Sequence, residues 1–251
     1  MPPTETNAYS GNNGRAAILN DSGGQNLLYT SGNAGNGATP QPDGFILGAG
    51  AQIMNPQYQP EREQQPGSPA PVGSFSITQL GNPPDKIGKD TNFRGLTIFN
   101  NVLYYTKGSG GNGVNTVYFV DTTGQACPNG TGLPQPGAAL PTSPIAYNPA
   151  LLQTEGVTPY NMCILQGFPT ALKSTTSFPF GIWFANANTL YVADEGNGDN
   201  TYDPNKLVAI TDPVSATSAP SGESFQTVQS PRSGQVLRGV SFTPGTGASG
   251  H

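Results

Sequence analysis

Residues 94–121, RGLTIFNNVLYYTKGSGGNGVNTVYFVD, contain the pattern from which the fold class follows. The three apolar segments of this stretch are rich in β-branched and aromatic residues, which favour strands. Asn100 and Asn101 separate the first two segments, and asparagine tolerates the backbone geometry of a tight turn. A loop of Gly, Ser and Asn at residues 108–113 reverses the chain again before the last segment. The stretch therefore predicts three antiparallel strands joined by short connections.

The same pattern recurs along the chain. Full copies begin at Arg15 (RAAILNDSGGQNLLYTSGNAGNG), at Arg94 and at Phe180 (FGIWFANANTLYVADEGNGDN), and a further start, RGVSFTPG, lies at Arg238. Each full copy has a Leu-Tyr or Tyr-Tyr pair in its second segment. Repeated units of short antiparallel strands are typical of β-propellers and related all-β repeat proteins. We therefore expect an all-β, propeller-like array of three to four antiparallel sheets that forms an incomplete or truncated ring.

Long loops separate the repeated units. Residues 55–71 and 127–159 are rich in Pro, and Pro-rich polar stretches form long loops or extended edge segments. We expect one β-propeller-like domain over residues 15–246, with an N-terminal extension at residues 1–14 and a C-terminal tail at residues 247–251.

The third copy carries a resemblance to a known group of proteins. Residues 178–198, FPFGIWFANANTLYVADEGNG, resemble the repeat starts of secreted bacterial β-propeller proteins of the NHL/YVTN-like kind. The resemblance covers the repeat cores and implies a propeller-like fold in a secreted protein. It carries over no catalytic residue, because no functional motif accompanies the repeat pattern. The uneven spacing and the small number of units depart from that pattern.

Composition and charge exclude several functions. Only 10% of the 251 residues are charged, and the formal net charge is −5. The densest cationic stretch, Lys86, Lys89 and Arg94, is interleaved with acids, whereas nucleic-acid binding requires a basic patch. No apolar run approaches the roughly 20 residues of a membrane-spanning helix. We therefore expect neither a nucleic-acid partner nor a membrane span.

The single histidine also restricts the chemistry that the chain can perform. It is His251, the last residue of a small, polar tail. Ser-His-Asp and Cys-His sites need a histidine that the fold holds beside the nucleophile. We therefore assign no catalytic residue and favour a protein that is not an enzyme.

An acidic loop in the third copy is a candidate cation site. Asp194, Glu195 and Asp199 alternate with Asn and Gly, and Asp203 follows shortly after. Carboxylate and amide oxygens at such spacing suit Ca²⁺, which takes six to eight oxygen ligands. The alternative is a solvated turn, because the same residue types favour turn geometry. The corresponding loops at residues 31–37 and 108–113 contain no carboxylate. Calcium is thus the one cofactor that the sequence suggests.

The repeat starts supply candidate ligand-binding residues. Arg15, Arg94 and Arg238 occupy equivalent positions and would line a central channel if the starts are inner strands. Guanidinium groups bind anions in a bidentate manner. Alternatively, each arginine pairs with an acid of a neighbouring unit, such as Asp121 or Asp212. Trp183 belongs to a set of strand aromatics that would either stack against sugar rings or pack in the core.

Cys127 and Cys163 are the only cysteines. They cannot form a structural zinc site without further ligands, so they form either a disulfide or two buried thiols. A disulfide would tie down the Pro-rich segment between them, and we expect that pairing. The first ten residues, MPPTETNAYS, lack the basic and apolar regions of a signal peptide. The chain is then either intracellular or a mature or truncated form. The weakly charged, polar composition favours an extracellular or periplasmic protein whose signal peptide has been removed or truncated.

These observations favour a non-catalytic, secreted or cell-envelope binding or scaffold protein. Its partner would be a small molecule, a glycan or a protein, and an incomplete ring would also allow an edge-to-edge homodimer. One alternative is a Ca²⁺-assisted hydrolase or lyase that uses the carboxylates of residues 194–203. Another is a truncated fragment without an independent function.

Overall fold

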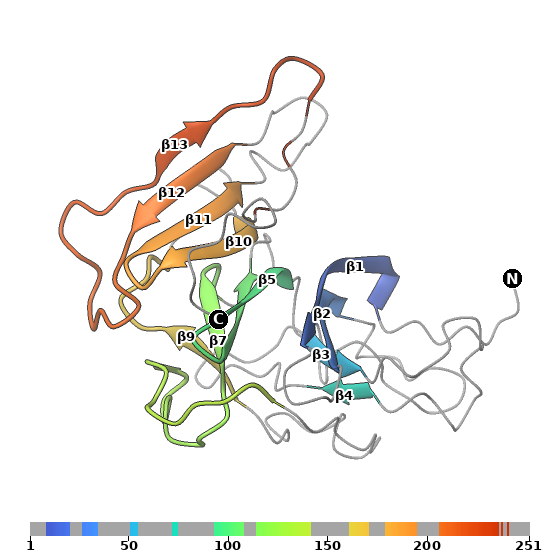
Figure 1. Cartoon of the computed structure of the whole chain (residues 1–251), viewed down its shortest axis with the longest axis vertical. Coiled ribbons are helices and arrows are strands. Elements are labelled where there is room, and N and C mark those ends of the chain that lie inside the picture. Colours follow the sequence, from blue (N-terminus) through green and yellow to red (C-terminus); the bar gives the residue numbers. More distant parts are fainter. Residues whose placement is uncertain are drawn as a thin grey trace, which may run out of the picture.

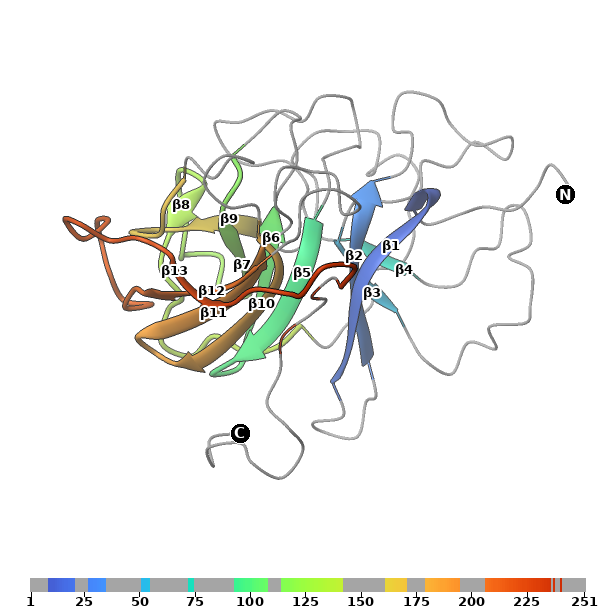
Figure 2. The same ribbon diagram turned by 90° about the horizontal axis from the view of Figure 1, so that it is seen from above.

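The described part of the chain folds into three β-sheets that lie side by side in chain order (Figures 1 and 2). The computed structural model describes residues 9–20, 27–34, 51–54, 72–74, 93–107, 114–141, 161–170, 179–194, 206–235, 237 and 240. These residues contain strands and turns but no helix, which confirms the all-β prediction at this level. The described strands do not close into a ring. The expected fourth start at Arg238 lies outside the described residues.

Each sheet begins with the hairpin of one repeat. The N-terminal sheet has the order β1 (Tyr9–Asn20), β2 (Leu27–Ala34), β3 (Ala51–Met54) and β4 (Val72–Ser74). The C-terminal sheet has the order β10 (Pro179–Asn186), β11 (Thr189–Asp194), β12 (Leu207–Thr211) and β13 (Gln226–Gln229). All neighbouring strands in these two sheets are antiparallel. The predicted hairpins are therefore confirmed in both outer sheets.

The middle sheet departs from the expected antiparallel pattern at one edge. Its order is β5 (Phe93–Phe99), β6 (Val102–Lys107), β7 (Val117–Asp121), β9 (Asn161–Leu165) and β8 (Thr131–Gly132). The β5–β6 hairpin turns at Asn100 and Asn101, which both have left-handed φ angles of 47° and 58°. Two consecutive left-handed residues define the hairpin turn that matches strand twist. At the other edge, β8 pairs with β9 in parallel, so the Pro-rich segment contributes an edge strand.

The middle sheet is buried on both faces because two cores share it. Successive side chains of a strand point to opposite faces of the sheet. On β6, Leu103 and Tyr105 belong to the core shared with the N-terminal sheet, whereas Val102 and Tyr104 belong to the core shared with the C-terminal sheet. The same alternation continues on β7. These two strands therefore have continuous apolar sequences instead of alternating polar and apolar residues.

A polar contact joins the N-terminal sheet to the middle sheet, because the hydroxyl of Tyr105 donates to the carbonyl oxygen of Thr30 in β2. Within the middle sheet, the Phe93 ring meets Tyr105 and Tyr118 edge-on, at centroid distances of 5.7 and 5.6 Å. The hydroxyl of Tyr29 donates to the carbonyl oxygen of Pro141 and accepts a hydrogen bond from the amide of Asn20. Buried tyrosines thus find partners for their hydroxyl groups while their rings contribute apolar contact.

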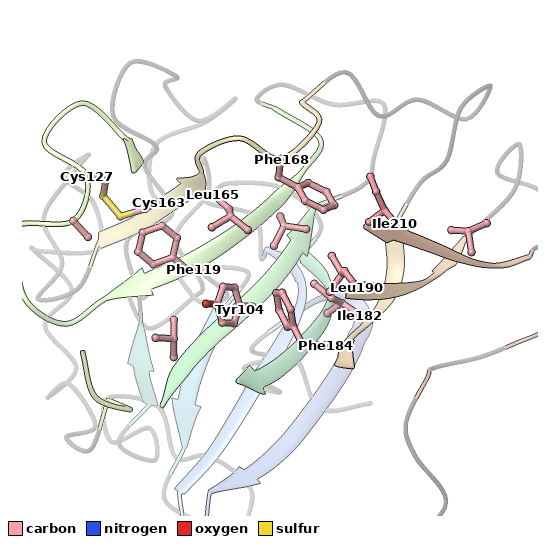
Figure 3. Packing of buried hydrophobic residues seen from close by; sticks show 14 residues of the cluster. Tyr104, Phe119, Cys127, Cys163, Leu165, Phe168, Ile182, Phe184, Leu190 and Ile210 are labelled. Carbon is pink, nitrogen blue, oxygen red and sulfur yellow. A yellow bond between two sulfur atoms is a disulfide. The ribbon is translucent and has the colours of Figure 1, made fainter. Parts of the chain in front are cut away.

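A second aromatic group joins the middle sheet to the C-terminal sheet (Figure 3). Phe184 of β10 stacks on Phe99, with centroids 5.0 Å apart. Its ring also meets Tyr104 at 4.6 Å, as Figure 3 shows. Ile182, Leu190 and other apolar side chains of the C-terminal sheet complete this core. Fully burying one large apolar side chain contributes roughly 1.5–3 kcal/mol, so the contact between these sheets is a principal source of stability.

Candidate functional site

The aspartate at the end of β7 organises the loop that follows it. Asp121 is buried, and its Oδ1 accepts hydrogen bonds from the backbone N–H groups of Thr123 and Gly124 and from the Thr123 hydroxyl. Its Oδ2 accepts a further bond from the N–H of Ala126 at 2.9 Å. A buried carboxylate is stable when its oxygens receive hydrogen bonds in this way. The Asp121 side chain therefore holds residues 122–126 in a fixed turn.

This turn leads directly to the disulfide, which the structure contains as expected. Cys127 is joined to Cys163 of β9, with the two Cα atoms 5.8 Å apart, and both residues are buried (Figure 3). The loop continues into β8, where the backbone at Gly132 is packed so closely that an added Cβ would lie 1.8 Å from the carbonyl oxygen of Ala126. Residues 121–132 thus form one tightly packed structural unit.

The same unit brings together three groups that resemble a metal site. Potential ligand atoms of Asp121, Cys127 and Cys163 lie within 4.8 Å of one another. However, both sulfur atoms are used in the disulfide, and the carboxylate already accepts four hydrogen bonds. This cluster is therefore structural.

The corresponding aspartate of the third repeat has a different environment. Asp212 follows β12 as Asp121 ends β7, and it is only 4% exposed. Its backbone N–H donates to the carbonyl oxygen of Asn188, and the N–H of Val214 donates to that of Ala187. The N–H of Val214, two residues after Asp212, is thus already used and does not bond the Asp212 carboxylate. In the other loop, the N–H two residues after Asp121 does bond the Asp121 carboxylate. The Oδ1 atom of Asp212 is buried and has no hydrogen-bond partner.

A second carboxyl group lies in the same region. Glu223 ends a turn in which its N–H donates to the carbonyl oxygen of Pro220, with Gly222 at a left-handed φ of 80°. Both carboxylate oxygens of Glu223 are shielded from solvent and lack hydrogen-bond partners. Glu223 also lines an open hollow of about 490 Å³ whose other polar walls include Thr211, Ser224 and Gln226. Asp212 does not line this hollow, and we take the carboxyl groups of Asp212 and Glu223 as the candidate site.

Burial and proximity both disfavour negative charge at this pair. Burial raises the pKa of Asp212 to about 6. Burial, together with a smaller contribution from the nearby charge of Asp212, raises the pKa of Glu223 to about 7. Carboxyl groups in unfolded chains titrate near pH 4. The folded protein therefore retains protons on this pair at pH values where the unfolded chain has released them.

This difference predicts a specific dependence of stability on pH. A raised pKa in the folded state stabilises the protein below the unfolded value, and that contribution is lost as the pH rises through the folded value. We therefore expect the free energy of unfolding to fall, relative to that of Asp212→Asn/Glu223→Gln, between about pH 4 and pH 7. Urea unfolding of both proteins in the presence of a chelator measures this. If the free energy of unfolding of the wild type minus that of the variant stays constant or grows with pH, the raised pKa values of Asp212 and Glu223 are contradicted.

The predicted arginine and tryptophan positions fall in different environments. Arg94 of β5 is buried and has an interaction partner, and Trp183 of β10 is half-buried with a partner as well. Arg15 of β1 is half-buried, and its Nε has no hydrogen-bond partner. Arg238 lies outside the described residues. The alternative interpretation, in which each arginine pairs with an acid such as Asp121 or Asp212, stays a prediction; the Asp121 carboxylate bonds to its own loop, and Oδ1 of Asp212 has no hydrogen-bond partner.

The acidic loop that the sequence suggested for calcium lies mostly outside the described residues. Asp194 is the last residue of β11, and only its backbone is described. Glu195, Asp199 and Asp203 lie outside the described residues. Calcium at this loop stays a prediction.

Sequence reasoning did not find the Asp212–Glu223 pair. Asp212 was noted only as a potential partner for arginine, and Glu223 was not singled out. One signal was available: Asp121 is followed by TTG, whose hydroxyl and N–H groups can bond the carboxylate, whereas Asp212 is followed by PVS. Proline has no N–H and valine has no hydroxyl, so this sequence offers the aspartate fewer donors.

Comparisons with protein-family models, with curated proteins and with solved structures found no match for this chain. In the described part of the chain, no helix has the length and hydrophobicity needed to cross a membrane. The fold and the site alone therefore define the class of protein, which is an all-β protein whose described strands form three stacked sheets. Beside the last sheet lie two acidic side chains, Asp212 and Glu223, with buried carboxyl oxygens that lack hydrogen-bond partners.

Proposed function

We propose that this chain is a non-catalytic, extracellular or periplasmic binding or scaffold protein whose sheets are successive units of a propeller-like array. Three features support the array. The sheets follow one another in chain order, each starts with the hairpin of one repeat, and neighbouring sheets pack through apolar faces. Stacked sheets of this kind need a covered face at each end, and their outer strands are potential binding edges.

The observation that carries the binding function is the outer strand β13. Among the described strands it pairs only with β12, and all four of its side chains are exposed. Its sequence, QTVQ, contains neither a charge nor a proline, the residues that commonly protect strand edges. An unprotected edge offers free backbone N–H and C=O groups to another strand.

A second copy of the chain is the partner that fits this edge. Two β13 strands paired antiparallel about a twofold axis at Val228 would place Val228 opposite its own copy and Thr227 opposite Gln229. Both pairings are compatible, because no like charges meet and the β-branched side chains can pack across the strands. A twofold interface of this type is self-complementary.

A charge introduced on the edge tests this arrangement. We expect the wild-type chain to form a reversible dimer in sedimentation experiments over a range of concentrations. Val228→Lys should shift the equilibrium to monomer, because a lysine at the centre of the edge would face its own copy. Val228 is 51% exposed, so the substitution should leave the fold intact.

Leu19→Lys is the matched control, because Leu19 is 53% exposed on β1 and receives the same charge far from β13. It should dimerise like the wild type. A monomeric wild-type chain at all concentrations, or a Val228→Lys dimer of unchanged affinity, would contradict the edge-to-edge assembly.

The other parts of the proposal rest on separate support. A buried disulfide is typical of proteins from oxidising compartments, which supports an extracellular or periplasmic location. Robust turnover of a lactone, phosphate ester or glycan by the purified protein would contradict the non-catalytic assignment. A Ca²⁺-assisted hydrolase using residues 194–203 stays a prediction, because the ligands that it needs lie almost entirely outside the described residues.

A further inference from the structure

The outer face of the C-terminal sheet is the face that points away from the middle sheet. Ile182, Phe184 and Ile210 point into the core that the C-terminal sheet shares with the middle sheet (Figure 3). Because side chains alternate along a strand, Trp183 on β10 and Ala209 on β12 belong to the outer face. Neither residue is part of a core formed by the described residues. The outer face is therefore not used in packing against the middle sheet.

The strand register aligns residues of four strands in one row on this face. Trp183 pairs with Tyr191, which pairs in turn with Ala209. Ala209 pairs with Gln226 of β13. Directly paired residues of neighbouring strands lie on the same face of a sheet, and neighbouring strands are about 4.8 Å apart. The row thus runs for about 14 Å at the backbone, from the indole of Trp183 to the amide of Gln226.

The amide end of the row borders the open hollow of about 490 Å³. The hydroxyl-bearing residues Thr211, Ser221 and Ser224 line this hollow together with Gln226. Among the described residues that line it, none is basic and only Glu223 is acidic. Both carboxylate oxygens of Glu223 are shielded from solvent. The hollow therefore offers neutral hydrogen-bonding groups and no exposed charge.

The groups at both ends of the row are held in place. Nε2 of Gln226 donates to the hydroxyl oxygen of Ser224 at 2.9 Å, which orients the amide and leaves its carbonyl oxygen as an acceptor. The turn before β13 is fixed by the hydrogen bond from the N–H of Glu223 to the carbonyl oxygen of Pro220. Trp183 is half-buried and already has an interaction partner, and both restrict its indole. A ligand would therefore have to order few side chains when it binds.

We propose that this face binds a short, neutral oligosaccharide, with one sugar ring against the Trp183 indole and another in the hollow. A sugar ring has an apolar face of C–H groups and a rim of hydroxyls that donate and accept hydrogen bonds. An aromatic side chain beside neutral hydroxyl and amide groups matches both features. The inference rests on the proposed binding function and names its ligand class, but it does not depend on the pairing of β13 edges.

Tryptophan fluorescence tests this inference, because Trp183 is the only tryptophan of the chain. The probes are the neutral tetrasaccharides cellotetraose, laminaritetraose, mannotetraose and xylotetraose. At least one should change the emission saturably, with a Kd of about 1 mM or tighter. Tetragalacturonate, which carries carboxylates, should bind more weakly because the hollow has no basic wall among the described residues. The inference is wrong if no neutral probe binds or if tetragalacturonate binds most tightly.

Substitutions at the two ends of the row locate the bound sugar. Measured by calorimetry, Gln226→Ala should weaken binding about fivefold, which is typical of losing one neutral hydrogen bond. Gln229→Ala is the matched control, because it removes the same side chain from an exposed position of β13 outside the hollow. Trp183→Leu should weaken binding about tenfold, whereas Trp183→Phe retains a ring and should lose less. Unchanged affinity in both Gln226→Ala and Trp183→Leu, with each variant folded by far-UV circular dichroism, would overturn the inference.

Val228→Lys separates this inference from the edge-to-edge assembly. Val228 does not line the hollow, so this variant should bind the tetrasaccharide like the wild type even though it is expected to be monomeric. Sugar binding by a chain that never dimerises would support the inference and contradict only the assembly. A dimer that binds no neutral tetrasaccharide would contradict only the inference.

Discussion

Removing the Cys127–Cys163 disulfide is expected to lower the free energy of unfolding by about 3–4 kcal/mol. The two cysteines are 36 residues apart in the sequence, so the bond closes a long loop in the unfolded chain. Closing a loop of this length restricts the unfolded state, and that restriction is lost in Cys127→Ala/Cys163→Ala. Chemical denaturation followed by circular dichroism measures the difference, and the midpoint should move to a clearly lower denaturant concentration.

The burial of the disulfide supplies the control for this experiment. Because both cysteines are buried, a reductant should reach the bond only when the chain unfolds. The wild type in reductant plus denaturant should therefore unfold like the double variant, and the variant should not respond to reductant. Equal stability of the oxidised wild type and the double variant would mean that the disulfide does not constrain the unfolded chain.

Phe184→Ala is expected to destabilise the protein by about 3–5 kcal/mol, which is typical of replacing a buried phenylalanine. Phe184 touches both Phe99 and Tyr104, so its removal opens a cavity between the middle and C-terminal sheets. The free energy of unfolding of a typical domain is only about 5–15 kcal/mol, so this single change removes a large fraction of it. Thermal unfolding should show a drop of roughly 10 °C in the melting temperature.

Leu19→Ala is the control for the loss of an apolar side chain. Leu19 is exposed, so its removal should change stability by no more than about 0.5 kcal/mol. A Phe184→Ala protein as stable as Leu19→Ala would show that the contact between the two sheets contributes little.

Much of the fold could be predicted from local sequence. The hairpins at Asn100-Asn101 and at residues 186–188 have turn residues between apolar segments, and the third strands end at or beside Asp121 and Asp212. β9 and β13 were not predicted. β9 is a short segment after a long Pro-rich stretch, and its partners β7 and β8 are distant in the sequence. β13 has four exposed side chains and so no apolar pattern to reveal it.

The candidate site was harder to predict because it depends on what is missing. Acid-rich loops are conspicuous in a sequence, so the sequence pattern indicates residues 194–203 as a cation site instead. Asp121 and Asp212 look alike in the sequence, since both follow an apolar strand of the same type. They differ in the residues that follow, TTG against PVS, and in whether the folded backbone leaves N–H groups for the carboxylate, which the three-dimensional arrangement shows.

The three sheets should unfold as a single cooperative unit, because β6 and β7 contribute side chains to both cores. Trp183, the only tryptophan, lies on β10 and reports on the C-terminal sheet, whereas far-UV circular dichroism reports on all strands. Thermal unfolding of the wild type followed by both signals is the most direct measurement. Coincident transitions are expected, and in Phe184→Ala both should move down together. A tryptophan transition separated from the circular dichroism transition would show that the C-terminal sheet unfolds independently, which would contradict a shared middle sheet.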